Sequence, residues 1–166
     1  MLLLLLFAAI HMQTIAQVTD DTRRVGLSAT IQGNQFGFLL PIWVGEHLSI
    51  APSIEVKSAA GIASEYGIGI IPRYYFATEK VAPYVGLRAG AIFYQPAKAK
   101  ELNLSSTTDV LVGAAFGSDY FFDPHFSIGV ELQGNFTFSD KNSIRFNNPG
   151  KVNFNTASAV ILSIYF

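Results

Sequence analysis

The chain has 166 residues, which is enough for one domain with a sizeable core and short for two. Half of the residues are hydrophobic, and only 14% are charged, against about 25% in a typical soluble domain. The formal net charge of −1 argues against nucleic acid as a partner, because no basic stripe is available to neutralise phosphates. The sequence contains no cysteine, which excludes disulfides, thiolate metal sites, cysteine nucleophiles and a lipid-anchored cysteine.

The chain begins with an apolar block, Leu2–Ile10, followed by the more polar His11–Gln17. The length of this block is typical of a secretory signal peptide, and Ala16 is a suitable small residue before a cleavage site. We therefore expect residues 1–16 to be a signal peptide and residues 17–166 to form the mature domain. The basic residues that usually open a signal peptide are missing, so the true start and the cleavage site stay open. A buried helix or strand of the mature fold is the alternative.

After the leader, apolar residues alternate with small or polar ones in segments separated by turn-forming residues. Because successive side chains of a strand point to opposite faces, each segment has one apolar and one polar face. The phase of the second segment is ambiguous, since residues 39–42 are apolar on both faces. The pattern predicts strands at residues 25–32, 36–44, 48–57, 66–76, 82–94, 109–121, 126–138 and 154–166.

The segment Phe126–Phe138 shows the alternation most clearly, with an apolar face broken only at Gly134. Its 13 residues exceed the usual strand of about 5–6 residues in a globular protein. They suit a tilted strand that crosses a bilayer, which needs about 9–11 residues. The chain ends with the same pattern, and its last residue is the aromatic Phe166.

The connections between the predicted strands differ in length. Those at residues 45–47, 78–80 and 123–125 are short, whereas those at 95–108 and 140–153 are long. Outer-membrane barrels have short periplasmic turns and longer extracellular loops. The predicted fold is therefore all-β, an eight-stranded antiparallel transmembrane β-barrel built as an up-and-down meander.

A soluble carrier of the lipocalin kind is the rival fold, because alternation alone does not say which face lies inside. The distribution of charge between the two faces distinguishes the two folds. The apolar face carries almost no charge, whereas a soluble barrel needs an outer face rich in Lys and Glu. The polar face mixes small residues with six charged ones: Glu55, Lys57, Arg73, Arg88, Asp119 and Glu131. We therefore expect the apolar face to contact lipid and the protein to reside in the cell outer membrane.

Two predicted hairpins resemble the small outer-membrane β-barrel domains of the OmpA/OmpX-like group. They are Pro72–Phe76 followed by Pro83–Gly90, and Gly113–Phe122 followed by Asp123–Glu131. The terminal Ile164–Phe166 is similar to the C-terminal signal of that group, so the resemblance implies that the barrel-insertion machinery binds Phe166. The resemblance covers essentially the whole mature chain. It implies an architecture rather than an activity.

The histidines give no support for catalysis. Lipid-modifying barrel enzymes place a histidine near the outer leaflet, but His47 and His125 fall in predicted periplasmic turns. Neither has neighbouring side chains that would complete a metal site. We expect solvated turn histidines, no catalytic residues, no metal and no cofactor.

Four charged residues are predicted to form an ion cluster in the lumen: Glu55, Arg73, Arg88 and Glu131. The interior of an eight-stranded barrel is only wide enough for side chains to fill it. Charges there have to pair, because an unpaired buried charge costs several kcal/mol. The cluster is expected to plug the barrel, and a gate or narrow polar path is the alternative.

The two long loops carry a mild basic excess, in Lys98, Lys100, Lys141, Arg145 and Lys151. These residues are candidates for contact with lipopolysaccharide phosphates or with a surface protein, and a merely solvated rim is the alternative. The predicted function is a structural or surface-interaction role through extracellular loops. A narrow transporter or a lipid-modifying barrel enzyme is the alternative. The sequence leaves the loop ligand and the oligomeric state open.

Overall fold

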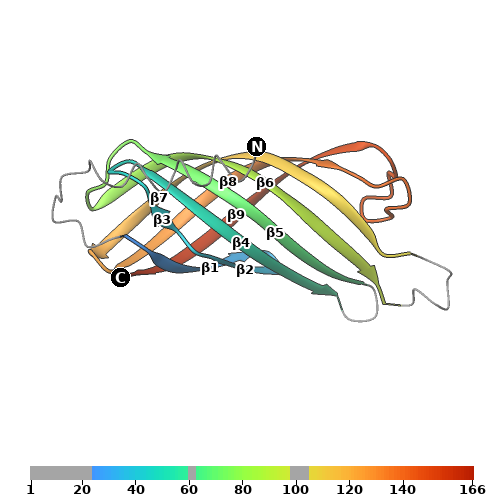
Figure 1. The fold of residues 1–166 in the computed structure, drawn as a ribbon, viewed down its shortest axis with the longest axis horizontal. Helices are drawn as coiled ribbons and strands as arrows, with labels where there is room; N and C mark the ends of the chain where they lie inside the picture. The colour runs from blue at the N-terminus through green and yellow to red at the C-terminus, as the bar shows by residue number, and fades with distance from the viewer. Residues whose placement is uncertain (1–23, 60–62, 98–104) are drawn as a thin grey trace, which may run out of the picture.

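The computed structural model describes residues 24–59, 63–97 and 105–166. The predicted signal peptide, Lys98 and Lys100 lie outside the described residues. The described residues form one antiparallel sheet that rolls into a long barrel (Figure 1). Within them, no helix is both long and apolar enough to cross a membrane.

The strands follow one another around the sheet in the order β2-β1-β9-β8-β7-β6-β5-β4-β3, and β2 also pairs with β4. This last pairing closes the ring. Because β2 and β3 both pair with β4, they are two halves of one strand, and the nine elements make an eight-stranded barrel, as predicted. The elements are β1 (Gly26–Gln32), β2 (Gln35–Leu39), β3 (Ile42–Trp43), β4 (Leu48–Ala59), β5 (Ala63–Tyr75), β6 (Val81–Pro96), β7 (Thr107–Asp123), β8 (Phe126–Phe138) and β9 (Val152–Tyr165).

The break between β2 and β3 lies at Pro41, which has no N–H to donate to a neighbouring strand. The chain nevertheless continues along the same path. The Leu40 amide donates to the Pro52 carbonyl at 3.0 Å, and the Pro41 carbonyl accepts from the Gly26 amide at 2.8 Å. The structure settles the phase that the sequence left ambiguous, since Leu39 is buried and Leu40 is exposed.

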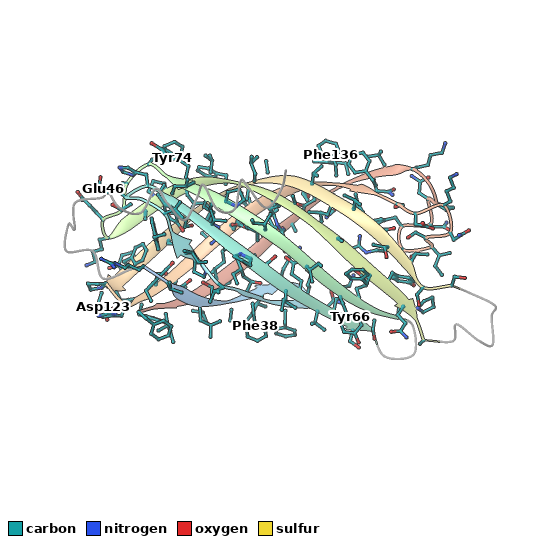
Figure 2. The ribbon with its side chains drawn as sticks, viewed as in Figure 1. Phe38, Glu46, Tyr66, Tyr74, Asp123 and Phe136 are labelled. Atoms are coloured by element: carbon teal, nitrogen blue, oxygen red, sulfur yellow. The ribbon has the colours of Figure 1, made fainter. Side chains whose placement is uncertain are left out.

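The barrel has its apolar side chains outside and its polar side chains inside. Within β8, the Leu132 side chain is 64% exposed, whereas its neighbour Glu131 is 3% exposed. Figure 2 shows the same orientation around the wall, where Phe38, Tyr74 and Phe136 point away from the barrel. The predicted assignment of the two faces is therefore correct.

The sequence prediction was wrong about the connection at residues 58–65. We expected a loop, but β4 extends to Ala59 and β5 starts at Ala63. Pairing continues through Lys57 and Glu65, whose side chains form a cross-strand ion pair at 3.4 Å. Backbone hydrogen bonds persist here although the apolar alternation has ended, because opposite charges also stabilise a cross-strand pair.

Closure of the barrel can be tested by a disulfide across the seam between β1 and β9. Ser28 and Ser163 are directly paired there, and their buried hydroxyls lie 2.7 Å apart. Paired residues have Cα atoms about 4.5–5.5 Å apart, within the range that a disulfide spans. We expect Ser28→Cys/Ser163→Cys to form an intramolecular disulfide on mild oxidation. Loss of free thiols, measured on the folded protein, is the readout.

The matched control is Ser28→Cys/Ser127→Cys. Ser127 pairs with Ser163 on its other side, so it lies two strands away from Ser28, at roughly 9–10 Å. This pair should keep both thiols free. Equal oxidation of the two variants would contradict the register of the closing strands.

Candidate functional site

One end of the lumen is filled by aromatic rings, which we call the aromatic floor: Trp43, Tyr75, Tyr84, Phe121 and Tyr165. Tyr75 has its ring centroid 4.7 Å from that of Trp43 and 5.0 Å from that of Tyr84. The five rings come from five different strands, and four of them are buried. The floor lies at the end of the barrel with the short turns, where β3, β5, β7 and β9 end.

Glycines on the polar face make room for these large side chains. A Cβ atom on Gly117 would lie 2.5 Å from the Tyr84 hydroxyl. A Cβ atom on Gly129 would collide with the Asp119 carboxylate. A narrow barrel can therefore hold bulky inward residues only where small ones stand opposite.

Beside the floor lies a sealed ion pair between Arg73 and Glu131. The Arg73 Nη2 atom donates to Glu131 Oε2 at 2.7 Å, and the two side chains are 3% and 2% exposed. The Tyr84 hydroxyl donates to the same oxygen at 2.8 Å, and the Arg73 guanidinium lies 4.8 Å from the Tyr84 ring centroid. Tyr75 donates to the nearby Asp119 carboxylate at 2.8 Å.

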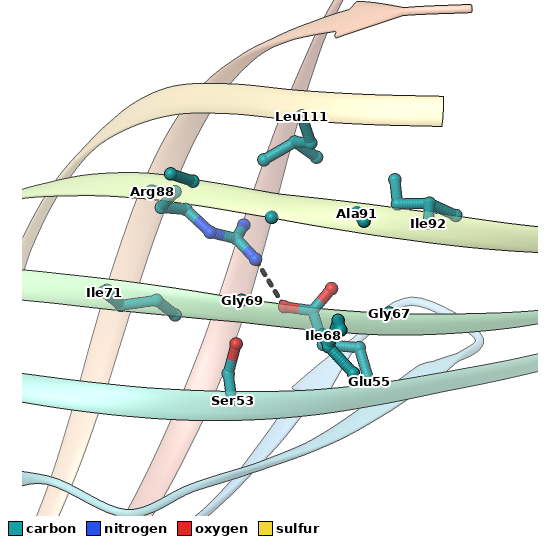
Figure 3. A pocket seen from close by; sticks show the side chains of 12 residues that line it. Ser53, Glu55, Gly67, Ile68, Gly69, Ile71, Arg88, Ala91, Ile92 and Leu111 are labelled. Atoms are coloured by element: carbon teal, nitrogen blue, oxygen red, sulfur yellow. Dashed lines mark hydrogen bonds and ion pairs between the residues drawn. The ribbon is translucent and has the colours of Figure 1, made fainter. Parts of the chain in front are cut away.

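The second ion pair joins Arg88 to Glu55, as Figure 3 shows. Arg88 also donates to the side-chain oxygen of Gln133, and Gln133 Nε2 donates to Glu131 Oε1 at 2.7 Å. Gln133 therefore connects the two pairs. The structure places all four residues of the predicted lumen cluster in one chain of hydrogen bonds.

The far end of the lumen, the mouth, is partly covered by the connection between β8 and β9. Arg145 Nε in this connection donates to Glu65 Oε2 at 2.8 Å. Asp109 accepts from the Ser143 hydroxyl at 3.0 Å and from the Asp140 amide at 2.9 Å. The connection is thus fixed to the inner wall by charged and polar groups.

The five residues predicted for loop contacts have different positions. Lys141 and Lys151 are exposed on the connection between β8 and β9. Arg145 instead points inward to Glu65 and is largely buried, because that carboxylate offers it a partner. Lys98 and Lys100 belong to the segment that the structure does not describe.

The two turn histidines occupy equivalent positions. His47 Nδ1 lies 2.9 Å from the Tyr75 carbonyl oxygen, and His125 Nδ1 lies 3.0 Å from the Tyr165 carbonyl oxygen. We predicted solvated turn histidines; His125 is exposed and His47 is half-buried, and one nitrogen of each ring also lies within hydrogen-bond distance of the last residue of a neighbouring strand. In residues 24–59, 63–97 and 105–166, no three His, Asp or Glu side chains converge as metal ligands.

Sequence reasoning placed Asp119 and Gln133 on the inward face but gave them no role in the site. Alternation was the available signal, because it assigns each residue to a face. It could not show that Gln133 bridges two ion pairs. That contact depends on the register between β6, β7 and β8.

The described barrel is similar to solved structures. The N-terminal β-barrel domain of Pseudomonas aeruginosa OprF matches with a TM-score of 0.58 at 13% identity, over 86% of this chain and 95% of that one. Neisserial surface protein A (NspA) matches with a TM-score of 0.56 at 15% identity, over 86% of this chain and 93% of that one. No family model and no curated protein sequence matches the chain. The two likenesses confirm the predicted fold, the small eight-stranded outer-membrane β-barrel fold of the OmpA/OmpX-like group.

The sealed ion pair should matter more for stability than the pair nearer the mouth. Arg73→Gln leaves the Glu131 carboxylate buried without its cation, which should lower the free energy of unfolding by about 3 kcal/mol. Arg88→Gln should cost less, because the Glu55 side chain is 18% exposed and can be hydrated. Urea unfolding in lipid vesicles, followed by the fluorescence of the single tryptophan Trp43, measures both variants.

Two controls accompany this comparison. Lys80→Gln removes a cation from an exposed turn and should change the free energy of unfolding by no more than about 0.5 kcal/mol. Arg73→Gln/Glu131→Gln removes both charges and should recover much of the loss. An Arg73→Gln protein as stable as the Lys80→Gln protein would contradict the importance of the sealed pair.

Proposed function

We propose that this protein is an outer-membrane barrel with a plugged lumen that acts in the envelope as a structural or surface-interaction protein. Its extracellular side would be the mouth, where the long connection between β8 and β9 lies. The observation that carries the proposal is the distribution of side chains, apolar outside and ion-paired inside. No catalytic or cofactor chemistry is needed for this role.

The outward face supports a location in a membrane. Exposed apolar side chains run along every strand of the barrel, as at Phe38, Leu87 and Val130. Aromatic side chains gather toward both ends, as in the aromatic girdles of outer-membrane barrels. Tyr120 and Phe122 have ring centroids 5.0 Å apart near the turns, and Phe136 and Phe154 have centroids 5.0 Å apart nearer the mouth.

The filled lumen supports a role that does not depend on solute flow. A solute moving along the barrel axis would meet the aromatic floor and then the Arg73–Glu131 pair. Their side chains are almost completely buried, with Tyr75 and Tyr84 at 1% and 0% exposed and the ion-paired side chains at 3% and 2%. This arrangement favours a closed barrel over the narrow transporter.

The exposed lysines of the mouth support a surface role. Lys141 and Lys151 extend from the connection between β8 and β9, while Arg145 and Ser143 hold that connection against the wall. A held loop presents its charges in a defined arrangement, which favours contact with phosphates or with another protein. Lipopolysaccharide is the proposed partner in the outer leaflet.

Membrane insertion without pore formation tests the closed barrel. Refolded into lipid vesicles, the protein should migrate differently on gels before and after boiling, because closed barrels resist the detergent. In planar bilayers it should give no large, stable conductance steps.

In cells it should fractionate with the outer membrane. Recovery in the soluble periplasmic fraction would refute the location, and stable conductance from the inserted protein would refute the plug.

Neutralising the two exposed lysines tests the surface role. Lys141→Gln/Lys151→Gln should weaken lipopolysaccharide binding several-fold at low salt, and the difference should shrink at high salt, since exposed charges are screened. Titration of the micelle-embedded barrel with lipopolysaccharide, at low and at high salt, measures the change in affinity. Arg24→Gln/Lys80→Gln removes the same charge from exposed positions at the turn end and is the matched control. Equal binding by the two double variants would count against the loop as the contact surface.

A further inference from the structure

The wall of the barrel is lower on one side of the mouth. β1 turns back at Gly33, whose φ of 58° suits a tight turn, and its last pair with β9 is Ile31↔Val160. β9 nevertheless continues outward to Val152, paired with β8 on its other edge. In the part of the chain that the structure describes, no strand pairs with the β1-facing edge of Val152–Ser158. We call this gap above the β1–β2 turn the notch.

Burial shows that the notch opens into the lumen. Ala159, below the notch, is 5% exposed, but the inward residues Ala157 and Asn155 are only half-buried. On the neighbouring strand β8, by contrast, Asn135 and Thr137, which pair with Asn155 and Asn153, are 1% and 0% exposed. The mouth is therefore sealed on the β8 side and open on the β1 side.

The notch also interrupts the apolar outer face. Along β9, the outward residues are apolar up to Val160, then Ser158 and Thr156 follow, and Phe154 resumes the apolar series. The residues that flank the gap are apolar and exposed, with Phe36 at 58% and Phe154 at 61%. The notch is thus a polar window framed by side chains that would face lipid.

A cavity of about 370 Å³ lies behind the window, within the size range of about 300–1,000 Å³ typical of ligand pockets. The β1–β2 turn and Asn155–Ser158 form its rim, and Arg145 with Phe146 forms its roof. Its inner wall contains Glu55, Lys57 and Arg88.

The charge of this cavity is positive. Its lining has three cations, Lys57, Arg88 and Arg145, and one anion, Glu55, which leaves 3 − 1 = +2. Counting Glu65, which pairs with Lys57 and Arg145, still leaves +1. An anionic group is therefore the favoured occupant. Amide side chains of the rim, among them Gln32 and Gln35, add neutral hydrogen-bonding groups.

We propose that the notch binds the anionic phosphate headgroup of one lipid from the side. The phosphate would enter the cavity toward Lys57 and Arg145, and the acyl chains would leave through the window along Phe36 and Phe154. A polar headgroup at the window would also supply partners for the unpaired edge of β9, which hydrocarbon cannot do. The inference rests on the proposed location in the outer membrane.

The test uses the full chain refolded in zwitterionic micelles and titrated by calorimetry with dihexanoyl phosphatidic acid. We expect saturable binding at one site. Lys57→Gln and Arg145→Gln should each weaken it about tenfold, and Lys80→Gln, which removes a cation at the other end of the barrel, should not. Thr156→Phe should also weaken binding by filling the window. Because Thr156 points outward, a phenylalanine there extends the apolar face and should not impair folding. This variant therefore still tests the site if one of the inner charge changes prevents folding.

Two further ligands separate the sources of phosphate. Glycerol 3-phosphate has the headgroup without acyl chains and should bind far more weakly. Dihexanoyl phosphatidylcholine has the chains without net charge and should also bind weakly. Binding of glycerol 3-phosphate as tight as that of the lipid would overturn the lipid site in favour of free phosphate. Equal binding of the two lipids, or an equal loss in Lys80→Gln, would overturn anionic recognition. A chain that shows no heat-dependent gel shift would refute the proposed membrane barrel instead.

Discussion

Closure of the sheet is the constraint on which the rest of this structure depends. An open sheet would leave two rows of unpaired backbone groups, and an apolar outer face provides them with no other partner. The ring is complete because β1 pairs with β9 across the seam and the broken strand β2/β3 pairs with β4. Once the ring is closed, each residue is fixed either inside or outside. The charged residues of the polar face are then confined to a narrow interior.

This confinement explains how the inward side chains are arranged along the barrel axis. Arg73 and Glu131 are sealed from water, so they need each other, and Tyr84 satisfies a further lone pair of the same carboxylate. Arg88 and Glu55 lie closer to the mouth and border the cavity. The interior therefore changes along its axis, from aromatic rings through a sealed ion pair to a partly exposed one.

Unequal strand lengths give the barrel its one-sided mouth. The hairpins of β4 to β7 continue outward, whereas β1 and β2 turn back early. A barrel with a level rim would bury Asn155 and Ala157 as it buries Asn135. Because the rim is lower here, the cavity that contains the inner charges opens to the outer face through the polar window. The early turn between β1 and β2 thus leaves a lateral opening at the proposed outer leaflet.

The sequence by itself determined the number of strands, the face of nearly every residue and the residues that carry the inner charges. Alternation has a period of two, and one-sided burial turns that period into a clear pattern at positions such as Glu131 and Leu132. Only the tertiary structure decided the partners, because register places Arg73 against Glu131 and Arg88 against Glu55 across strands distant in the chain. It also decided that Arg145 points inward and that β4 and β5 extend through residues expected to form a loop. Both outcomes depend on Glu65, whose partners Lys57 and Arg145 come together only when the strands are paired. The notch has the same origin, since the height of a barrel wall is a relation between neighbouring strands and no single segment contains it.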